Sequence, residues 1–232
     1  MKKRSKGYLA LSEKVEKGKR YELDEAIKLV KETAVVKFDA TIELVVKLNL
    51  DSKKTDQQLR GAMILPHGTG KESKVLVLAT GDQAKEAKTA GADFVGDDDL
   101  IEKIEKESWF DFDVLIATPD IMPKLGKLGK KLGPKGLMPN PKTGTVTNEV
   151  GRAVEDSKKG RIEYRSDSYG NVHVIIGKVS FGEKELTENL ISVVDTLSKE
   201  RPSTVKGEYI KNIAICSSMG PGIKINKNVF DK

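Results

Sequence analysis

The chain has 232 residues, of which 41 are Lys or Arg and 35 are Asp or Glu, and its formal net charge is +6. Hydrophobic residues make up 38% of the chain and recur along its whole length, which indicates a folded protein of one or two domains. No apolar stretch approaches the ~20 residues that a membrane-spanning helix needs, and no apolar run typical of a secretory signal follows the basic N-terminus. The single cysteine, Cys216, excludes an intramolecular disulfide framework, and only His67 and His173 could join it in a metal centre. We therefore expect a cytoplasmic protein with no cofactor, no metal and no membrane association.

Charged residues are segregated along the chain. Residues 1–20 hold eight Lys or Arg and two Glu, and residues 124–142 hold six Lys and no acid. Residues 93–113, by contrast, hold nine acids and two Lys. A basic surface would bind a polyanion with strong salt dependence, whereas each charge run taken alone is also explained as solvated surface.

The first part of the chain has a helical pattern followed by a strand pattern. Leu23, Ile27 and Val30 lie at helical spacing, which predicts a helix within the first ~35 residues. Apolar and polar residues then alternate over 41–50. This alternation predicts a strand with one buried and one mostly polar face, as in an antiparallel sheet.

The middle of the chain has a different pattern. Short apolar runs at 75–79 and 114–118 are typical of strands that are covered on both faces. Helical patterns follow Gly81 and Asp97, with a short strand pattern at 92–95 between them. Strands that alternate with helices in this way indicate a parallel α/β unit.

The alternating pattern returns after about residue 160. An apolar stripe from Leu186 to Leu197 predicts a helix, and turn residues between 164 and 172 predict a hairpin. Further strands are predicted at 161–165, 172–176 and 213–215.

Because the two ends of the chain share one pattern, we expect them to form one discontinuous domain. Residues 1–67 and 160–232 would build an α+β domain, an antiparallel sheet with helices on one side, into which residues 68–159 are inserted as an α/β domain. Both crossings between the domains contain glycines, which tolerate hinge dihedrals.

Two segments could contact phosphate. Gly68–Lys71 lacks the flanking residues of a phosphate-binding loop, because Leu65 and Glu72 stand where Gly and Ser or Thr are required. The Lys-rich segment 124–142 does not match a dinucleotide fingerprint, and its prolines oppose a helix. It is either a phosphate-contacting loop or an exposed loop without a ligand.

Polar residues gather on the outer face of the predicted sheet, where with flanking Lys they could recognise folded RNA through 2′-hydroxyl and phosphate groups. They are Thr41, Glu43, Arg161, Glu163 and Arg165. The Ser217–Gly222 segment after the last predicted strand is either a plain turn or a place where the backbone closely approaches a partner.

Five segments of the chain are distinctive: 36–44, 51–61, 65–71, 128–142 and 218–221. In their order and their residue sequences, these segments closely resemble the bacterial form of the L-one family, the ribosomal proteins of the mobile stalk of the large subunit. The resemblance covers essentially the whole chain. It implies two domains, the first built from both termini and the second, a Rossmann-like α/β domain, inserted between hinges.

The resemblance also implies a function and a set of partners. The family binds large-subunit rRNA at the stalk beside the exit site and assists the release of deacylated tRNA. It commonly also binds a similar site on its own operon mRNA and represses its translation. By this resemblance the chain is a structural ribosomal protein and not an enzyme, located on the cytoplasmic ribosome, and a monomer when free.

The resemblance also implies which residues contact RNA, because positions of this chain can be matched one by one to the contact positions of the family. The approach to a strand, a hairpin and the terminal turn are expected to contact RNA through Lys37, Phe38, Thr41, Glu43, Arg165, Asp167, Ser168, Ser217, Ser218, Met219 and Gly220. The family often has Thr where this chain has Ser218, so the hydroxyl is kept and a methyl group is lost. Secondary contacts with the RNA or tRNA backbone are expected from Lys127, Lys130, Lys131 and Lys135.

Two other functions stay open at this point. One is a nucleotide-dependent enzyme that uses the inserted domain, against which the incomplete phosphate loop argues. The other is a generic basic nucleic-acid chaperone, which would bind any RNA with similar affinity.

Overall fold

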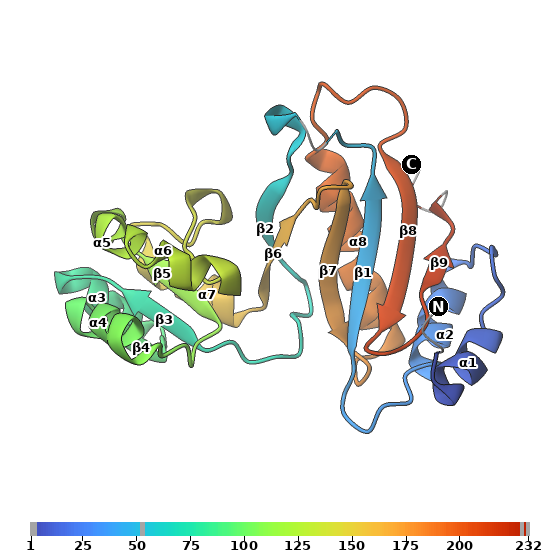
Figure 1. Ribbon diagram of the computed structural model, residues 1–232, viewed down its shortest axis with the longest axis horizontal. Coiled ribbons are helices and arrows are strands. Elements are labelled where there is room, and N and C mark those ends of the chain that lie inside the picture. Colours follow the sequence, from blue (N-terminus) through green and yellow to red (C-terminus); the bar gives the residue numbers. More distant parts are fainter. Residues whose placement is uncertain (1–3, 52–53, 228–229, 231–232) are drawn as a thin grey trace. The chain divides into compact units, whose positions relative to one another are not determined.

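The computed structural model describes residues 4–51, 54–227 and 230. The chain divides into two compact units, one formed by Met1–Gly70 with Ile162–Lys232 and the other by Lys71–Arg161 (Figure 1). Part of the basic N-terminal run, and Ser52 and Lys53 of one family segment, lie outside the described residues. Each unit is described separately below.

The first unit takes its elements from both parts of the chain (Figure 1). Its helices are α1 (Lys6–Glu13), α2 (Leu23–Glu32) and α8 (Glu183–Lys199), with a short 3-10 helix η1 (Thr55–Gln57). Its strands are β1 (Thr41–Leu48), β2 (Arg60–Ile64), β6 (Arg161–Arg165), β7 (Asn171–Lys178), β8 (Ile210–Ser217) and β9 (Ile223–Ile225).

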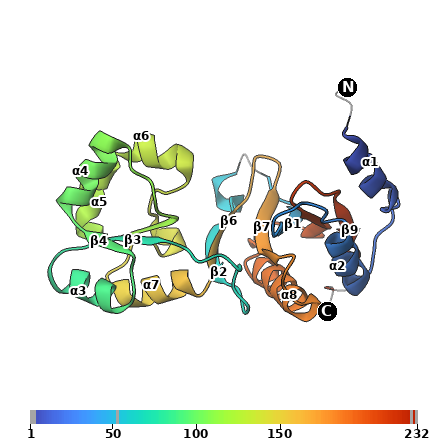
Figure 2. The same cartoon turned by 90° about the horizontal axis from the view of Figure 1, so that it is seen from below.

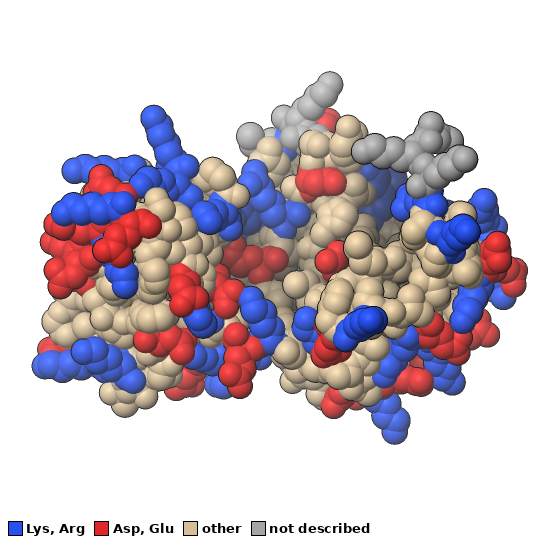
Figure 3. Space-filling model, turned by 60° about the horizontal axis from the view of Figure 1, so that its bottom comes forward, with Lys and Arg blue, Asp and Glu red and all other residues tan. Residues whose placement is uncertain are grey.

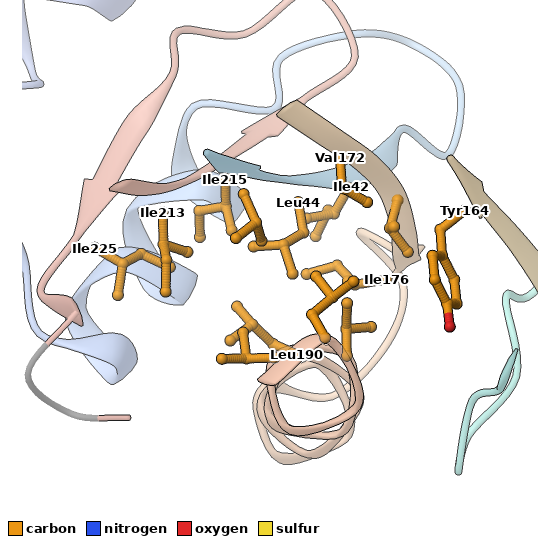
Figure 4. Close-up of a cluster of buried hydrophobic side chains, with 14 of the residues drawn as sticks. Ile42, Leu44, Tyr164, Val172, Ile176, Leu190, Ile213, Ile215 and Ile225 are labelled. Carbon is orange, nitrogen blue, oxygen red and sulfur yellow. The ribbon is translucent and has the colours of Figure 1, made fainter. Parts of the chain in front are cut away.

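An antiparallel sheet in the order β7-β1-β8-β9 forms the centre of the first unit. Helices α2 and α8 lie against one face of it (Figure 2). The predicted alternation in β1 is confirmed, because Leu44 is buried on the helical face whereas Glu43 is exposed on the other. Figure 4 shows the buried side chains that fill this core, among them Ile42, Val172, Ile176, Leu190 and Ile215.

Asn189 of α8 holds the segment that leads out of the first unit. Its side chain is fully buried, and its Oδ1 accepts a hydrogen bond from the N–H of His67 at 3.0 Å. Its Nδ2 donates to the carbonyls of Gly68 at 3.1 Å and of Ile176 at 2.8 Å. A buried amide satisfied in this way joins β7, α8 and the crossing segment into one body.

Strand β6 departs from the predicted sheet. It pairs with β2 in a separate two-stranded sheet, and a bridge between Ser166 and Val172 joins its end to β7. Alternation shows which residues of one strand share a face, but it does not show which strands pair. The prediction that polar residues of β6 share the outer face of β1 is therefore wrong. This correction applies to Arg161, Glu163 and Arg165.

The second unit is an α/β layer structure around a three-stranded parallel sheet in the order β4-β3-β5. The strands are β3 (Val75–Leu78), β4 (Phe94–Gly96) and β5 (Val114–Ala117). The helices are α3 (Gly81–Thr89), α4 (Asp98–Glu107), η2 (Pro119–Ile121), α5 (Met122–Gly126), α6 (Gly129–Leu132), η3 (Gly133–Lys135), η4 (Pro141–Thr143) and α7 (Val150–Lys158).

Helices cover both faces of this parallel sheet (Figure 2). On one face, Val77 packs with Val154 of α7 in a cluster that α3 also joins. On the other face, Leu76 packs in a cluster with Ile104 of α4 and Leu132 of α6. The continuous apolar runs predicted as doubly covered strands are therefore confirmed as such.

The Lys-rich segment 124–142 is not the loop that its composition predicts. As far as Lys135 it forms the short helical pieces α5, α6 and η3. Pro134 and Pro141 do not oppose helical turns, because each lies in the first turn of η3 or η4, where the missing N–H is not needed. The residues that anchor the pieces at helical spacing are Ile121, Leu125, Leu128 and Leu132.

No helix within the described ranges is both long enough and apolar enough to cross a membrane. The same residues contain no group of three or more His, Cys, Asp or Glu arranged to hold a metal ion.

Candidate nucleic-acid interface

The turn after β8 is tied to the start of β1. The N–H of Ser218 donates to the carbonyl of Thr41 at 3.0 Å, and the N–H of Thr41 donates to Ser218 Oγ at 3.2 Å. At the end of β7, Lys178 Nζ donates to Thr41 Oγ1 at 2.9 Å. Groups from β1, β7 and the turn after β8 therefore meet at Thr41, which gives the turn a defined position at this end of the sheet.

Met219 and Phe38 present apolar side chains to solvent at this end of the sheet. Met219 is 81% exposed and directly follows Ser218, while Phe38 is 60% exposed and lies shortly before Thr41. Met219 has a φ of 64°, a left-handed conformation that costs a non-glycine residue about 1 kcal/mol. A strained backbone beneath an exposed side chain indicates that the turn is shaped to present it.

Ser217 and Gly220 shape the turn from inside. The Ser217 side chain is 3% exposed, and its Oγ has no hydrogen-bond partner among the described residues. A Cβ at Gly220 would collide with that oxygen, so a larger residue there would have to displace the Ser217 hydroxyl. The alternation of β8 places the Ser217 side chain on the buried side of the strand, so its hydroxyl is not exposed in this structure.

Glu43 lies on the outer face of β1, between Ile175 of β7 and Cys216 of β8. Burial, and then the charge of Glu43, raise the pKa of the Cys216 thiol. This shift favours the neutral thiol over the nucleophilic thiolate. An exposed carboxylate beside neutral side chains can accept hydrogen bonds from base amino groups or 2′-hydroxyls.

The predicted hairpin lies at the opposite end of β1. The N–H of Leu48, the last residue of that strand, donates to the carbonyl of Gly170 at 2.8 Å. A strand of eight residues spans roughly 23 Å at ~3.3 Å per residue. The predicted contact residues thus form two groups: the terminal-turn end (Lys37, Phe38, Thr41, Glu43 and 217–220) and the hairpin end (Arg165, Asp167 and Ser168).

Asp167 is occupied in shaping the hairpin. Its Oδ1 accepts hydrogen bonds from the N–H groups of Tyr169 at 2.8 Å and Asn171 at 2.7 Å, and its Oδ2 accepts one from Asn171 Nδ2 at 2.8 Å. Burial alone would raise the pKa of Asp167, but these hydrogen bonds and the nearby His173 hold it below its usual value. At the hairpin end, Arg165 and Ser168 are the predicted contact residues with exposed side chains.

Two polar residues on the outer face of the sheet were not among the predicted contact residues. Lys47 donates from Nζ to the carbonyl of Tyr169, and His173 is exposed opposite Val45. The alternation over 41–50 already places Lys47 on the same face as Glu43, so the pattern was sufficient to find it. His173 required knowledge that β7 pairs with β1.

Comparison with known proteins decides the family. Residues 30–221 match the model of the ribosomal protein L1p/L10e family, a range that includes the approach to β1, the hairpin and the terminal turn. The chain belongs to this family. Its non-enzymatic nature and cytoplasmic location, both expected from the resemblance, are confirmed by this assignment.

The L1p/L10e chain is similar to curated relatives over nearly its full length. Large ribosomal subunit protein uL1 of Phytoplasma australiense is 61% identical over 224 residues, which cover 97% of each chain. The protein of the same name from Mesoplasma florum is 57% identical over 228 residues, covering 98% of this chain and 100% of the relative. That of Onion yellows phytoplasma is 60% identical over 224 residues, with 97% of each covered.

In this L1p/L10e protein the four predicted lysines of the second unit differ in their surroundings. Lys131 donates from Nζ to the carbonyl of Glu105, and Lys135 Nζ lies 4.3 Å from the ring centroid of Phe110, a cation–π contact. All four side chains, including those of Lys127 and Lys130, are exposed. The ammonium groups of Lys131 and Lys135 already make these contacts, so they turn to a phosphate less readily than those of Lys127 and Lys130.

The acidic and basic blocks of the L1p/L10e chain, separate in sequence, meet within the second unit. Lys124 pairs with Asp98 at 2.6 Å, and Lys131 Nζ donates to the carbonyl of Glu105. Figure 3 shows blue and red side chains side by side over this unit. Exposed pairs of this kind add little stability, but they reduce the basic surface that the Lys-rich segment would otherwise present.

Proposed function

We propose that the chain is a structural protein of the large ribosomal subunit that binds large-subunit rRNA at the mobile stalk near the exit site. The observation that carries the proposal is the junction of Ser218 with Thr41. It joins residues from distant parts of the chain at one end of the sheet, where Met219 follows Ser218 and Phe38 precedes Thr41, and both side chains are exposed. Membership of a ribosomal protein family supports the same function.

The groups at the terminal-turn end suit a folded RNA. Met219 and Phe38 offer flat apolar contact to sugars or bases, and the Thr41 hydroxyl can bond a 2′-hydroxyl or phosphate. Lys37 supplies positive charge for a phosphate. Glu43 repels phosphate, so its contribution is specificity: it accepts hydrogen bonds from base or 2′-hydroxyl donors that are placed to reach it.

The proposal includes the domain organisation. Residues 1–67 with 160–232 act as the α+β RNA-binding domain, and residues 68–159 act as the inserted Rossmann-like α/β domain. The division of the chain into two compact units and the parallel sheet with helices on both faces support this organisation. In the inserted domain, Lys127 and Lys130 contact RNA or tRNA backbone.

Three further elements of the proposal come from the resemblance. The protein assists the release of deacylated tRNA from the exit site. It binds its own operon mRNA and represses translation from it. It is a monomer when free. Because rRNA and mRNA would use one surface, the operon leader should displace a bound stalk fragment in a competition titration.

The test compares two RNAs at one physiological ionic strength. The protein is titrated into a labelled stalk fragment of large-subunit rRNA and, separately, into a perfect RNA duplex of equal length. We expect the stalk fragment to bind at least about 1,000-fold more tightly, as specific sites do. Similar affinity for both RNAs would contradict the proposal and favour a generic nucleic-acid chaperone.

A further inference from the structure

Two aromatic side chains in the described part of the chain are exposed by more than a third, Phe38 at 60% and Tyr169 at 75%. They lie at the two ends of β1. Phe38 precedes the strand, and Tyr169 adjoins Gly170, whose carbonyl is bonded to Leu48 at the end of the strand. A single exposed aromatic residue is ordinary on a protein surface. The way the backbone of Tyr169 is held distinguishes it.

The backbone of Tyr169 is held on both sides of the side chain. Its N–H donates to Asp167 Oδ1 at 2.8 Å, and its carbonyl accepts from Lys47 Nζ. The next residue, Gly170, has a φ of +75°, and a Cβ there would lie 3.1 Å from the carbonyl oxygen of Leu48. The turn is therefore packed directly on the end of β1. An aromatic ring with two rotatable bonds on such a turn loses little entropy when it is contacted.

Hydrogen-bond donors surround the base of this turn. Lys47 lies at the Tyr169 carbonyl, and His173 Nε2 lies 3.9 Å from Asp167 Oδ2. Ser168 is exposed beside Tyr169. An aromatic plane flanked by ammonium, imidazole and hydroxyl groups matches an unpaired nucleotide, whose base stacks and whose phosphate and 2′-hydroxyl accept hydrogen bonds.

We infer that the Tyr169 ring stacks on an unpaired nucleobase of the bound RNA, roughly 23 Å along β1 from the contact at Met219. The inference rests on the proposed function and adds to it a second contact point and its ligand, a base outside Watson–Crick pairing. Asp167 then acts as a positioning residue that holds the turn. In this arrangement the Tyr169 ring, and not the Asp167 carboxylate, contacts the RNA at this point.

The experiment measures the affinity of the full chain for the labelled stalk fragment with Tyr169→Ala, Tyr169→Phe and a control. Tyr169→Ala should weaken binding about 5- to 160-fold, the range for loss of one stacked base. Tyr169→Phe keeps the ring and should stay within about twofold of wild type. Neither variant should change the dependence of log Kd on log salt, because no charge is removed. Ile191→Ala removes a 37% exposed apolar side chain from α8 and should leave affinity unchanged.

Each outcome separates the stacking from the proposed function. If Tyr169→Ala binds like the wild type while the wild type still prefers the stalk fragment over duplex, the stacking is overturned and the proposed function stands. An equal loss in Tyr169→Phe would assign the contact to the phenol hydroxyl and also overturn the stacking. A wild-type protein without preference for the stalk fragment would overturn both. A photoreactive phenylalanine analogue at position 169 should cross-link to an unpaired nucleotide, and cross-links only to paired nucleotides would refute the inference.

Discussion

Ser218 and Thr41, 177 positions apart in the chain, are hydrogen-bonded to each other in both directions. The backbone of Ser218 donates to the Thr41 carbonyl, and its side chain accepts from the Thr41 N–H. The hydroxyl thus takes the place that a carbonyl would have in one more step of the ladder between β1 and β8. The Ser218 side chain therefore extends the hydrogen bonding between β1 and β8 by one residue, at a point where the backbone has already entered the turn.

Ser218→Ala removes the acceptor of the Thr41 N–H. We expect it to lower the free energy of unfolding by about 1 kcal/mol, the net contribution of one hydrogen bond, and to weaken binding of the stalk fragment. Ser218→Thr keeps the hydroxyl and should leave both quantities unchanged. Urea denaturation and RNA titration measure the two effects, and equal losses in both variants would show that the hydroxyl is not the cause.

Met219 allows stability and RNA affinity to be separated. Met219→Ala should reduce specific RNA affinity by about 1–3 kcal/mol, by analogy with the loss of one specific contact, without a change in unfolding free energy. Met219→Gly should reduce affinity as much but raise stability by up to about 1 kcal/mol, because Gly adopts the left-handed φ of 64° without strain. A destabilised Met219→Gly variant would contradict the strained-turn description.

Asn189→Ala would leave three backbone groups of the first unit without partners: the N–H of His67 and the carbonyls of Gly68 and Ile176. We expect a loss of about 3 kcal/mol or more in unfolding free energy and faster hydrogen exchange at the His67 amide. Ile191→Ala on the same helix should change stability by less than about 0.5 kcal/mol. A comparable loss in the two variants would show that truncation of α8, not the amide, is responsible.

The buried Tyr209 predicts a stability change at alkaline pH. Burial, and then the charge of Glu200, raise the pKa of Tyr209 from 10.0 to about 12. The unfolded chain therefore releases this proton more readily than the folded chain does. Its contribution to stability is complete below pH 10 and is lost as the pH rises toward 12. Tyr209→Phe should make the unfolding free energy less dependent on pH in this window, and an unchanged dependence would contradict the assignment.

The lysines of the second unit predict a difference in salt dependence. Lys127→Gln with Lys130→Gln should reduce the slope of log Kd against log salt by roughly 1 to 2, because each phosphate contact contributes about 0.7–0.9. The pair Lys131→Gln with Lys135→Gln should change it less, since those ammonium groups already contact Glu105 and Phe110. Equal slopes for the wild type and the first pair would show that this segment does not contact phosphate.

Much of the fold could be predicted from local patterns. The alternation over 41–50 correctly predicted which residues of β1 are buried, because one face of that strand meets helices. The helical pieces within 119–135 were missed, because glycines and prolines there obscured the spacing of Leu125, Leu128 and Leu132. In the structure these three leucines are buried along one side of the short helical pieces, as apolar side chains are along one side of a longer, regular helix.

The candidate site was harder to predict because it depends on pairing. The contact residues could be named from the family, but their separation into two ends of β1 required the register of β7 and β8 against it. The inward orientation of Ser217 depends on its place opposite Ile42. The exposure of Tyr169 depends on how the turn packs against Leu48.

Because β1 lies between β7 and β8 in its sheet, both strands that pair with it are synthesised later than β1 itself. Both neighbours of β1 leave the ribosome after the whole second unit, so the strand waits unpaired while that unit is made. The junction at Thr41 cannot close until Ser218 has emerged. A nascent chain that ends before Ser218 therefore lacks the junction at Thr41, and a product truncated before β8 would lack the terminal turn altogether.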